Sequence, residues 1–220
     1  MIKYLGSKRT LIPALTQLGK ASGAKTALDL FTGTTRVAQA FKKLGMTVTA
    51  SDVASYAECF GKTWIELDST QVNQAELDVA IAELNALPGE AGYFTEKFCV
   101  EARYFQPKNG EKVDAMRKHI ELEYKESWLY YPLLTSLILA ADRVDSTTGI
   151  QMAFLKGWAS RSANNLELRD PELLPGAGFS VRGDALEIAK DLPAVDLAYL
   201  DPPYNQHRYF SNYHIWESLV

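Results

Sequence analysis

The chain has 220 residues, of which 47% are hydrophobic, so it is long enough to bury one sizeable core and a small second one. Its formal net charge is −4, but residues 1–43 hold eight basic side chains and only one acidic side chain. Such basic clustering attracts phosphate groups, although lysines that merely solvate helix faces explain it equally well. No apolar run approaches the roughly 20 residues of a membrane helix, so we expect no membrane partner.

Cysteine and histidine usage bears on metals and on the cellular compartment. Cys59 and Cys99 are isolated in the sequence, and the three histidines lack the spacing of metal ligands. Isolated cysteines fit a reducing compartment better than a disulfide scaffold, and residues 1–10 do not read as a secretory signal. We therefore expect a cytoplasmic protein without a metal site.

The first half of the chain predicts a β-α-β unit. Residues 26–31 form a short apolar run, which is followed by the glycine turn "TGTTR" and by apolar residues at helical spacing in residues 37–45. Residues 46–52 predict a second strand, which ends in Asp52 and leads into another helix. Two strands joined by a helix in this way are typical of a parallel sheet.

A second pair of strands is predicted late in the chain. Residues 178–192 indicate a strand and then a helix, and residues 195–200 indicate a further strand, so four strands of one sheet are expected. The intervening residues 63–175 are mainly helical in pattern and too long to be a loop. The sequence therefore predicts an α/β fold with a helical insertion. Within the insertion, helices are expected in residues 71–87, 112–124 and 127–144, the last of them buried.

The glycine turn is a candidate cofactor site. Gly33 follows the first strand, where open α/β sheets bind cofactors because glycine lets the backbone approach a ligand beside a helix N-terminus. Asp52 ends the next strand about twenty residues later and can accept hydrogen bonds from a ribose diol. The alternative is that Asp52 caps the helix that starts at Val53. Residues 5–10 lack the spacing of a phosphate-binding loop, which disfavours a nucleotide triphosphatase, and Ser7 fits a helix cap.

The stretch "LDPPY" follows the last predicted strand. Asp201 stands at the carboxyl end of that strand, where its carboxylate can accept a hydrogen bond from an amine. Pro202 and Pro203 have no N–H and a fixed φ, so the loop is stiff and its carbonyls are free to accept. Tyr204 adds an aromatic face. Two acceptors beside an aromatic ring suit a planar group with an exocyclic amine, such as a nucleobase, although a capped proline-rich turn remains the alternative.

Together with "KYLGSKRTLIP" and "ALDLFTGTTRVAQAF", this loop resembles the D12 class of DNA adenine-N6 methyltransferases, the Dam-like group. The blocks occur in the family's order and the resemblance covers almost the whole chain. It implies a Rossmann-like S-adenosylmethionine-dependent methyltransferase sheet formed by residues 1–62 and 176–220. Residues 63–175 would be the insertion that recognises the DNA target. Because family members continue with further strands, we expect that the C-terminal strands are missing from this chain.

The resemblance also implies roles for individual residues, with S-adenosylmethionine as the cofactor and no metal. The family's first motif often has a second glycine where this chain has Thr35, so a different backbone path is expected there. The implied cofactor-binding residues are Tyr4, Gly6 and Lys8 at the methionine end, Asp29, Phe31 and Gly33 in the pocket, Asp52 at the ribose, and Asp184 near the adenine. The implied catalytic residues are Asp201, Pro202, Pro203 and Tyr204.

The implied activity is transfer of a methyl group to the N6 amine of an adenine flipped out of double-stranded DNA. The alternatives are a non-catalytic or inactive fragment that binds cofactor or DNA, and a methyltransferase for another exocyclic amine, on cytosine N4 or on RNA. Asp201 favours adenine, because family members that act on cytosine more often have serine at that place. A cognate restriction nuclease is left open as a partner. Candidate phosphate contacts, with surface salt bridges as their alternative, are Arg143, Lys156, Arg161 and Arg169.

Overall fold

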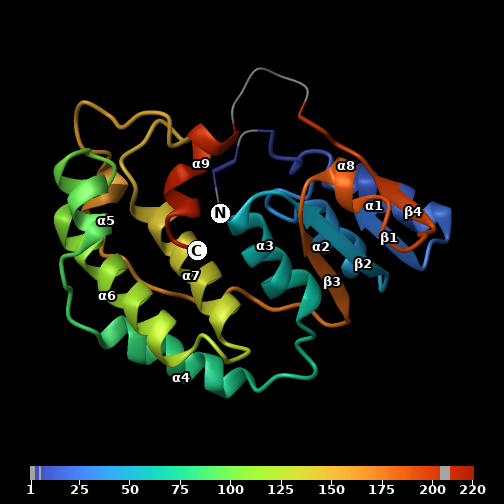
Figure 1. Ribbon diagram of the computed structural model, residues 1–220, viewed down its shortest axis with the longest axis horizontal. Helices are drawn as coiled ribbons and strands as arrows, with labels where there is room; N and C mark the ends of the chain where they lie inside the picture. The colour runs from blue at the N-terminus through green and yellow to red at the C-terminus, as the bar shows by residue number, and fades with distance from the viewer. Residues whose placement is uncertain (1–2, 5, 204–208) are drawn as a thin grey trace. The chain divides into compact units, whose positions relative to one another are not determined.

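The computed structural model describes residues 3–4, 6–203 and 209–220, so the predicted catalytic residue Tyr204 lies outside the described residues (Figure 1). The chain divides into two compact units. We call them the sheet unit and the helical unit. The sheet unit comprises Gly6–Asn73 and Glu172–Gln206, and the helical unit comprises Met1–Leu5, Gln74–Pro171 and His207–Val220.

The sheet unit contains a four-stranded parallel sheet in the order β3-β2-β1-β4. The central strands β1 and β2 pair from Thr26 opposite Thr47 to Asp29 opposite Ala50. The predicted α/β fold, with four strands in one parallel sheet, is confirmed. The strands are β1 (Thr26–Asp29), β2 (Thr47–Asp52), β3 (Gly178–Arg182) and β4 (Leu197–Tyr199).

Helices cover the sheet, because side chains on both faces of β2 are buried: Val48 and Ala50 on one face, and Thr49 and Ser51 on the other. Val48 and Ala50 of β2 are fully buried, as parallel strands with covered faces require. Helix α2 packs against β1 and β2, and helix α3 packs against β2 and β3. The helical segments of this unit are α1 (Ile12–Ser22), α2 (Arg36–Lys42), α3 (Ser55–Gly61), η1 (Lys62–Glu66) and α8 (Ala185–Ile188).

Helix α3 approaches β3 closely at Gly61. A Cβ atom at this position would lie 2.2 Å from Ser180 Oγ and 3.0 Å from Ser180 Cβ. We expect Gly61→Ala to destabilise the protein by about 1–3 kcal/mol, as overpacking of a filled interior does. Urea unfolding would measure this. The double variant Gly61→Ala/Ser180→Ala should recover part of the loss, and equal losses in the single and double variants would refute the contact.

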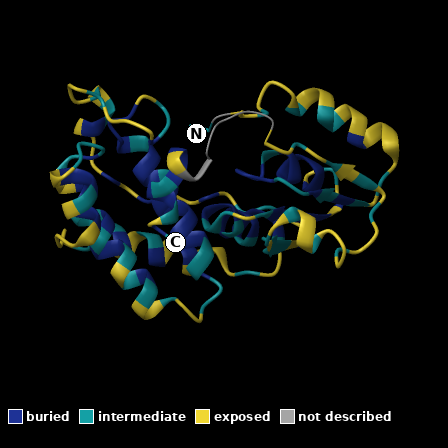
Figure 2. Ribbon diagram, turned by 45° about the horizontal axis from the view of Figure 1, so that its top comes forward, coloured by how far each residue is buried: buried dark blue, intermediate teal, exposed yellow. Residues whose placement is uncertain are grey.

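The helical unit is built around the buried helix α7. Leu133, Leu134, Leu137 and Ile138 of α7 are fully buried, which confirms an apolar buried helix within the predicted residues 127–144, from Tyr130 on. Figure 2 shows that buried residues, in dark blue, lie in helices as well as in strands. Within the described residues, no helix combines the length and the apolar character needed to cross a membrane. The helical segments are α4 (Gln74–Ala86), α5 (Tyr93–Thr95), η2 (Glu96–Val100), α6 (Pro107–Glu123), α7 (Tyr130–Val144), η3 (Ser160–Ala163) and α9 (Tyr209–Glu217).

The N-terminal residues join this unit through polar and aromatic contacts. The backbone N–H of Lys3 donates to the Asp142 carboxylate at 3.2 Å, and Lys3 Nζ lies 3.2 Å from Asp145 Oδ1. Tyr4 stacks on Tyr213 of α9, with ring centroids 4.7 Å apart. The boundaries of the two compact units differ from those of the predicted domains. The prediction joined residues 1–62 and 176–220 in one domain and assigned residues 63–175 to the insertion. A role for the helical unit in target recognition stays a prediction.

Residues 164–170, the extended segment, run beside α4, α6 and α7 without pairing in a sheet. Side chains replace the missing strand partner. Asn109 Oδ1 accepts from Leu166 N at 3.0 Å, Asn85 exchanges hydrogen bonds with both Leu168 N and Leu168 O, and Ser136 Oγ does the same with Arg169. Leu166 and Leu168 are buried, whereas residues 165, 167 and 169 between and beside them are exposed.

Replacing Asn109 should loosen the extended segment. Asn109 also donates to Ser162 O at 3.3 Å and Asn164 O at 3.0 Å, so Asn109→Ala leaves several buried backbone groups without partners. We expect a loss of about 2–4 kcal/mol of unfolding free energy. The neighbouring exposed Asn165→Ala is the control and should change stability by less than about 0.5 kcal/mol. Equal losses in both variants would contradict the role of the buried amide.

Candidate active site

An aspartate stands at or just beyond the carboxyl end of each of the four strands. Asp29 and Asp52 are the last residues of β1 and β2, and Asp184 and Asp201 stand two residues beyond β3 and β4. Since the strands are parallel, their carboxyl ends share one edge of the sheet, where ligands of such sheets bind. Register supports this, because Asp29 lies opposite Tyr199 of β4. Side chains far apart in the sequence are thus gathered at one edge.

Asp29 is buried and incompletely hydrogen-bonded. Its Oδ2 atom accepts from Thr32 Oγ1 at 2.9 Å and from Ala38 N at 3.1 Å. Its Oδ1 atom has no hydrogen-bond partner among the described residues. Burial raises the pKa of this carboxyl to about 7, although the two hydrogen bonds oppose the shift, and the charges of Asp52 and Asp201 raise it further. Asp29 therefore changes charge near neutral pH.

Asp52 connects the glycine turn to the second strand. Gly33, whose φ of +51° suits glycine, donates its N–H to Asp52 Oδ2 at 2.8 Å. Asp52 Oδ1 accepts from Ala54 N at 3.1 Å, but the predicted cap of a helix starting at Val53 is wrong, because α3 begins at Ser55 and its N-cap residue is Ala54. These contacts orient a half-buried carboxylate at the sheet edge. The ribose contact of Asp52 stays a prediction. Phe31, which precedes the turn, is half-buried.

Thr35 takes the conformation that a glycine would take. Its φ is +58°, in the left-handed region that costs a β-branched residue of the order of 1 kcal/mol or more. Two hydrogen bonds hold it there: Thr35 Oγ1 donates to Thr34 O at 2.8 Å and accepts from Gln39 Nε2 at 2.8 Å. The side chain thus stabilises a turn that glycine would adopt without strain.

Lys8 reaches the loop that follows β4. Its Nζ atom forms an ion pair with Asp201 Oδ2 and donates to Gly6 O at 3.1 Å. Gly6 itself has φ +75°, which places it in a tight turn. The Lys8 and Asp201 side chains are 19% and 27% exposed, so the pair is accessible to a ligand. Pro202 and Pro203 follow at exposed positions.

Two predicted cofactor-binding residues, Tyr4 and Asp184, contact parts of the fold other than the glycine turn and the loop after β4. Tyr4 belongs to the helical unit, where it stacks on Tyr213, and Trp216 continues the stack. Asp184 is exposed and caps α8, because its side chain accepts from Leu186 N at 2.8 Å. Their contacts with a cofactor remain predictions.

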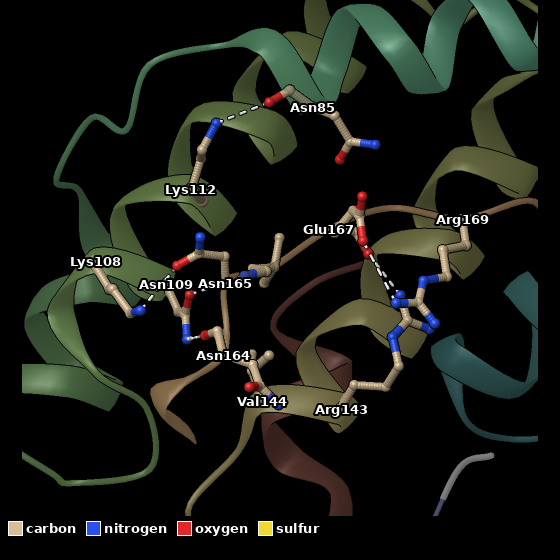
Figure 3. A pocket seen from close by; sticks show the side chains of 11 residues that line it. Asn85, Lys108, Asn109, Lys112, Arg143, Val144, Asn164, Asn165, Glu167 and Arg169 are labelled. Carbon is tan, nitrogen blue, oxygen red and sulfur yellow. Dashed lines mark hydrogen bonds and ion pairs between the residues drawn. The ribbon is translucent and has the colours of Figure 1, made fainter. Parts of the chain in front are cut away.

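The predicted phosphate contacts differ in their surroundings. Arg143 and Arg169 line one pocket of the helical unit (Figure 3). Arg161 is engaged within the fold instead, because its Nε atom pairs with the buried Asp145 at 2.6 Å and its Nη2 atom donates to Thr147 O. Lys156 is exposed. Arg143 and Arg169 thus line a pocket whereas Arg161 is held by Asp145 and Thr147, and phosphate contacts by any of them stay a prediction.

Some site residues escape the sequence analysis. Ser51 Oγ is a second buried polar atom without a partner among the described residues, beside Asp52 at the same sheet edge. The sequence offered one indication of Ser51, a hydroxyl side chain within a predicted strand. Lys108 and Lys112 line the pocket of Arg143 and Arg169. Their spacing of four residues on one helix indicates from the sequence alone that they lie on the same face. The pocket itself could not be predicted, because it depends on the position of the extended segment, which local sequence patterns do not determine.

The parallel sheet carries a glycine turn after β1 and an Asp-Pro-Pro loop after β4. The model of the D12 class N6 adenine-specific DNA methyltransferase family matches residues 4–220, and the chain belongs to this family. The resemblance read from the sequence motifs is confirmed.

Several relatives match along the whole chain. It is 34% identical over 237 residues to "Modification methylase StsI" of Streptococcus sanguinis, of which it covers 36%. It is 32% identical over 235 residues to "Type II methyltransferase M.NlaIII" of Neisseria lactamica, of which it covers 69%, and 28% identical over 240 residues to "Type II methyltransferase M.FokI" of Planomicrobium okeanokoites, of which it covers 37%. The chain thus spans about a third to two thirds of these relatives. No solved structure matches it.

Proposed function

We propose that this chain transfers a methyl group from S-adenosylmethionine to the N6 amine of an adenine flipped out of double-stranded DNA. The observation that carries the proposal is the position of Asp201: it follows β4 at the carboxyl edge of the sheet, paired with Lys8, where three further aspartates gather. Membership of an adenine-specific DNA methyltransferase family supports the choice of substrate.

The residues at the sheet edge fit S-adenosylmethionine. Asp29 Oδ1 is a buried acceptor that lacks a partner among the described residues, and Asp52 adds a second carboxylate within electrostatic reach of it. A set of carboxylates favours a ligand that carries positive charge and hydrogen-bond donors. The cofactor has both, on its sulfonium, its ammonium and its ribose. We assign its binding to Gly33, Asp29 and Asp52, with Gly6 and Lys8 at the methionine end.

The chemistry required of the protein is to raise the nucleophilicity of an amine. The N6 lone pair of adenine is delocalised into the ring, so the amine is a poor nucleophile. When bound, S-adenosylmethionine supplies an electrophilic methyl group on a sulfonium. Asp201 would accept a hydrogen bond from one N6 proton, and the Pro202 carbonyl would accept from the other, which draws the lone pair out of conjugation. Both acceptors stand on a stiff loop, so little reorganisation is needed.

We propose a second role for Asp201, which is to accept the proton that the methylated amine must lose. Once the N6 nitrogen carries the methyl group it bears an extra proton, and a carboxylate already hydrogen-bonded to that nitrogen can accept the proton and release it to water. Lys8 pairs with Asp201 in this structure. We propose that the ion pair keeps the carboxylate ready to accept until the amine replaces Lys8 as its partner.

DNA must present the amine outside the stack. Extruding a base costs about a few kcal/mol, and Tyr204 beside the two prolines is proposed to stack on the extruded adenine. The relatives are named modification methylases and type II methyltransferases, which supports a restriction nuclease as a cellular partner.

Label transfer tests the proposal. The chain is incubated with S-adenosylmethionine that carries a labelled methyl group and with unmethylated DNA of high sequence complexity, so that no recognition sequence has to be assumed. We expect label in duplex DNA and none in RNA. If cofactor and DNA both bind but no label transfers, the chain is a binding fragment and the catalytic proposal fails.

A further inference from the structure

The helical unit contains a positively charged pocket of about 710 Å³ (Figure 3). Helices α4, α6 and α7 and the extended segment line it. Among the described lining residues are four cationic side chains and one carboxylate, that of Glu167. The whole chain is acidic, so this local excess of positive charge contrasts with the protein average. The cations are Lys108, Lys112, Arg143 and Arg169.

Two guanidinium groups meet on one side of the pocket. The pKa of Arg143 is lowered, first by burial and then by the charge of Arg169. Glu167 is shared between them, because its carbonyl accepts from Arg143 Nη2 at 2.6 Å and its carboxylate lies 3.4 Å from Arg169 Nη2. Glu167 is the one carboxylate among the described lining residues and is 62% exposed, and the charge of Asp142 also acts on Arg143. An anion placed here would gain charge-assisted hydrogen bonds from both arginines.

The two lysines are anchored by neutral groups. Lys108 Nζ donates to Ala163 O at 2.7 Å and to Asn165 Oδ1 at 2.8 Å. Lys112 Nζ donates to Asn85 O at 3.0 Å and to Leu87 O. Carbonyl oxygens fix the position of an ammonium group without cancelling its charge. An ammonium has three donors, so each lysine keeps one for a ligand.

The wall formed by the extended segment is preorganised. Asn85, Asn109 and Ser136 hold its backbone at three points, and the alternation of buried and exposed residues turns Glu167 and Arg169 outward. A wall fixed before binding loses little conformational entropy on binding. This favours a defined ligand position over a diffuse charged surface.

We propose that this pocket binds a phosphodiester group of the DNA substrate, with Arg143 and Arg169 as its ligands and Lys108 and Lys112 strengthening the local field. The proposal rests on the proposed function, which makes DNA the substrate. Glu167 orients the two arginines. Since phosphates carry no sequence information, the pocket positions the DNA irrespective of sequence.

Binding of a fluorescent duplex, followed by anisotropy over a range of salt concentrations, tests the pocket. We expect Arg169→Gln and Arg143→Gln each to lower the affinity about 5- to 10-fold at moderate salt. Each should also reduce the slope of log K against log salt by about 0.9, equally for different sequences. Arg169→Lys should keep the slope. The control is Lys118→Gln on α6, an exposed lysine paired with Glu90 outside the pocket, which should bind as the wild type does.

The outcomes separate the pocket from the catalytic proposal. Unchanged affinity and slope in both arginine variants overturn the pocket, even if the wild type transfers methyl groups. Loss of DNA affinity in these variants supports the pocket even if the wild type transfers none. In a second arm, inorganic phosphate competes with the duplex. Tight binding of phosphate that the variants abolish, with DNA affinity unchanged, identifies a free-anion site and refutes the DNA assignment.

Discussion

Replacing Asp201 with alanine should reduce the rate of methyl transfer by about 10²–10³-fold, with the affinity for S-adenosylmethionine within about threefold of the wild-type value. The carboxylate is the acceptor that activates the amine, and it stands on the loop after β4, whereas Gly33 and Asp52 hold each other in the glycine turn independently of it. Single-turnover transfer of labelled methyl groups measures the chemical step, and titration measures cofactor affinity.

Lys8 supplies the control for this variant, because Asp201→Ala also breaks the ion pair. Lys8→Met breaks the same pair but leaves the carboxylate in place. We expect a smaller reduction of the chemical rate in Lys8→Met than in Asp201→Ala. Equal reductions would mean that the ion pair, and not the acceptor, carries the effect. An Asp201→Ala protein that transfers methyl groups at the wild-type rate would rule out the mechanism.

The second large effect concerns Asp29 and the pH dependence of stability. The pKa of this buried carboxyl is about 7 in the folded protein, whereas the ordinary value is 3.8. Between these two pH values the folded state retains a proton that the unfolded state has released. Stability therefore falls as the pH rises from about 4 to 7, by about 1.4 kcal/mol per pH unit and about 4 kcal/mol in all, and is flat above 7.

Asp29→Asn removes this dependence, because an amide does not titrate. The free energy of unfolding of Asp29→Asn minus that of the wild type should therefore increase from pH 5 to pH 7 and stay constant at higher pH. Urea unfolding at pH 5, 6, 7 and 8 measures the difference. Asp196→Asn is the contrasting variant: its carboxylate accepts from Lys25 N and Thr26 N, which lowers its pKa, so its stabilising effect is lost toward acid pH. A difference for Asp29→Asn that is independent of pH would contradict the elevated pKa.

The sequence predicted the sheet edge well, for a local reason. Each strand is a short apolar run that ends close to an aspartate, so the pattern locates Asp29, Asp52, Asp184 and Asp201 without any knowledge of tertiary contacts. Parallel pairing then brings these residues together. The ion pair between Lys8 and Asp201 could not be predicted, because it joins residues from opposite ends of the chain.

Other features depend on contacts that no local pattern encodes. The sequence does not show that Asp29 Oδ1 lacks a hydrogen-bond partner among the described residues, because this depends on how the glycine turn and α2, whose residues donate to Oδ2, pack around the carboxylate. Tyr4 joins the helical unit because α9 supplies Tyr213, and the sequence motif instead grouped Tyr4 with Gly6 and Lys8. The charged pocket exists because Asn85 and Asn109 bind the backbone of a segment more than fifty residues further along the chain. Long-range amide contacts of this kind leave no periodic signal.

Identifying the methylated atom tests the central claim most directly. DNA treated with the chain and S-adenosylmethionine is digested to nucleosides, which are separated and analysed by mass spectrometry against N6-methyldeoxyadenosine and N4-methyldeoxycytidine standards. The account predicts N6-methyldeoxyadenosine, absent after treatment with Asp201→Ala. Methylated cytosine, or methylated adenine at equal yield in the Asp201→Ala reaction, would contradict it.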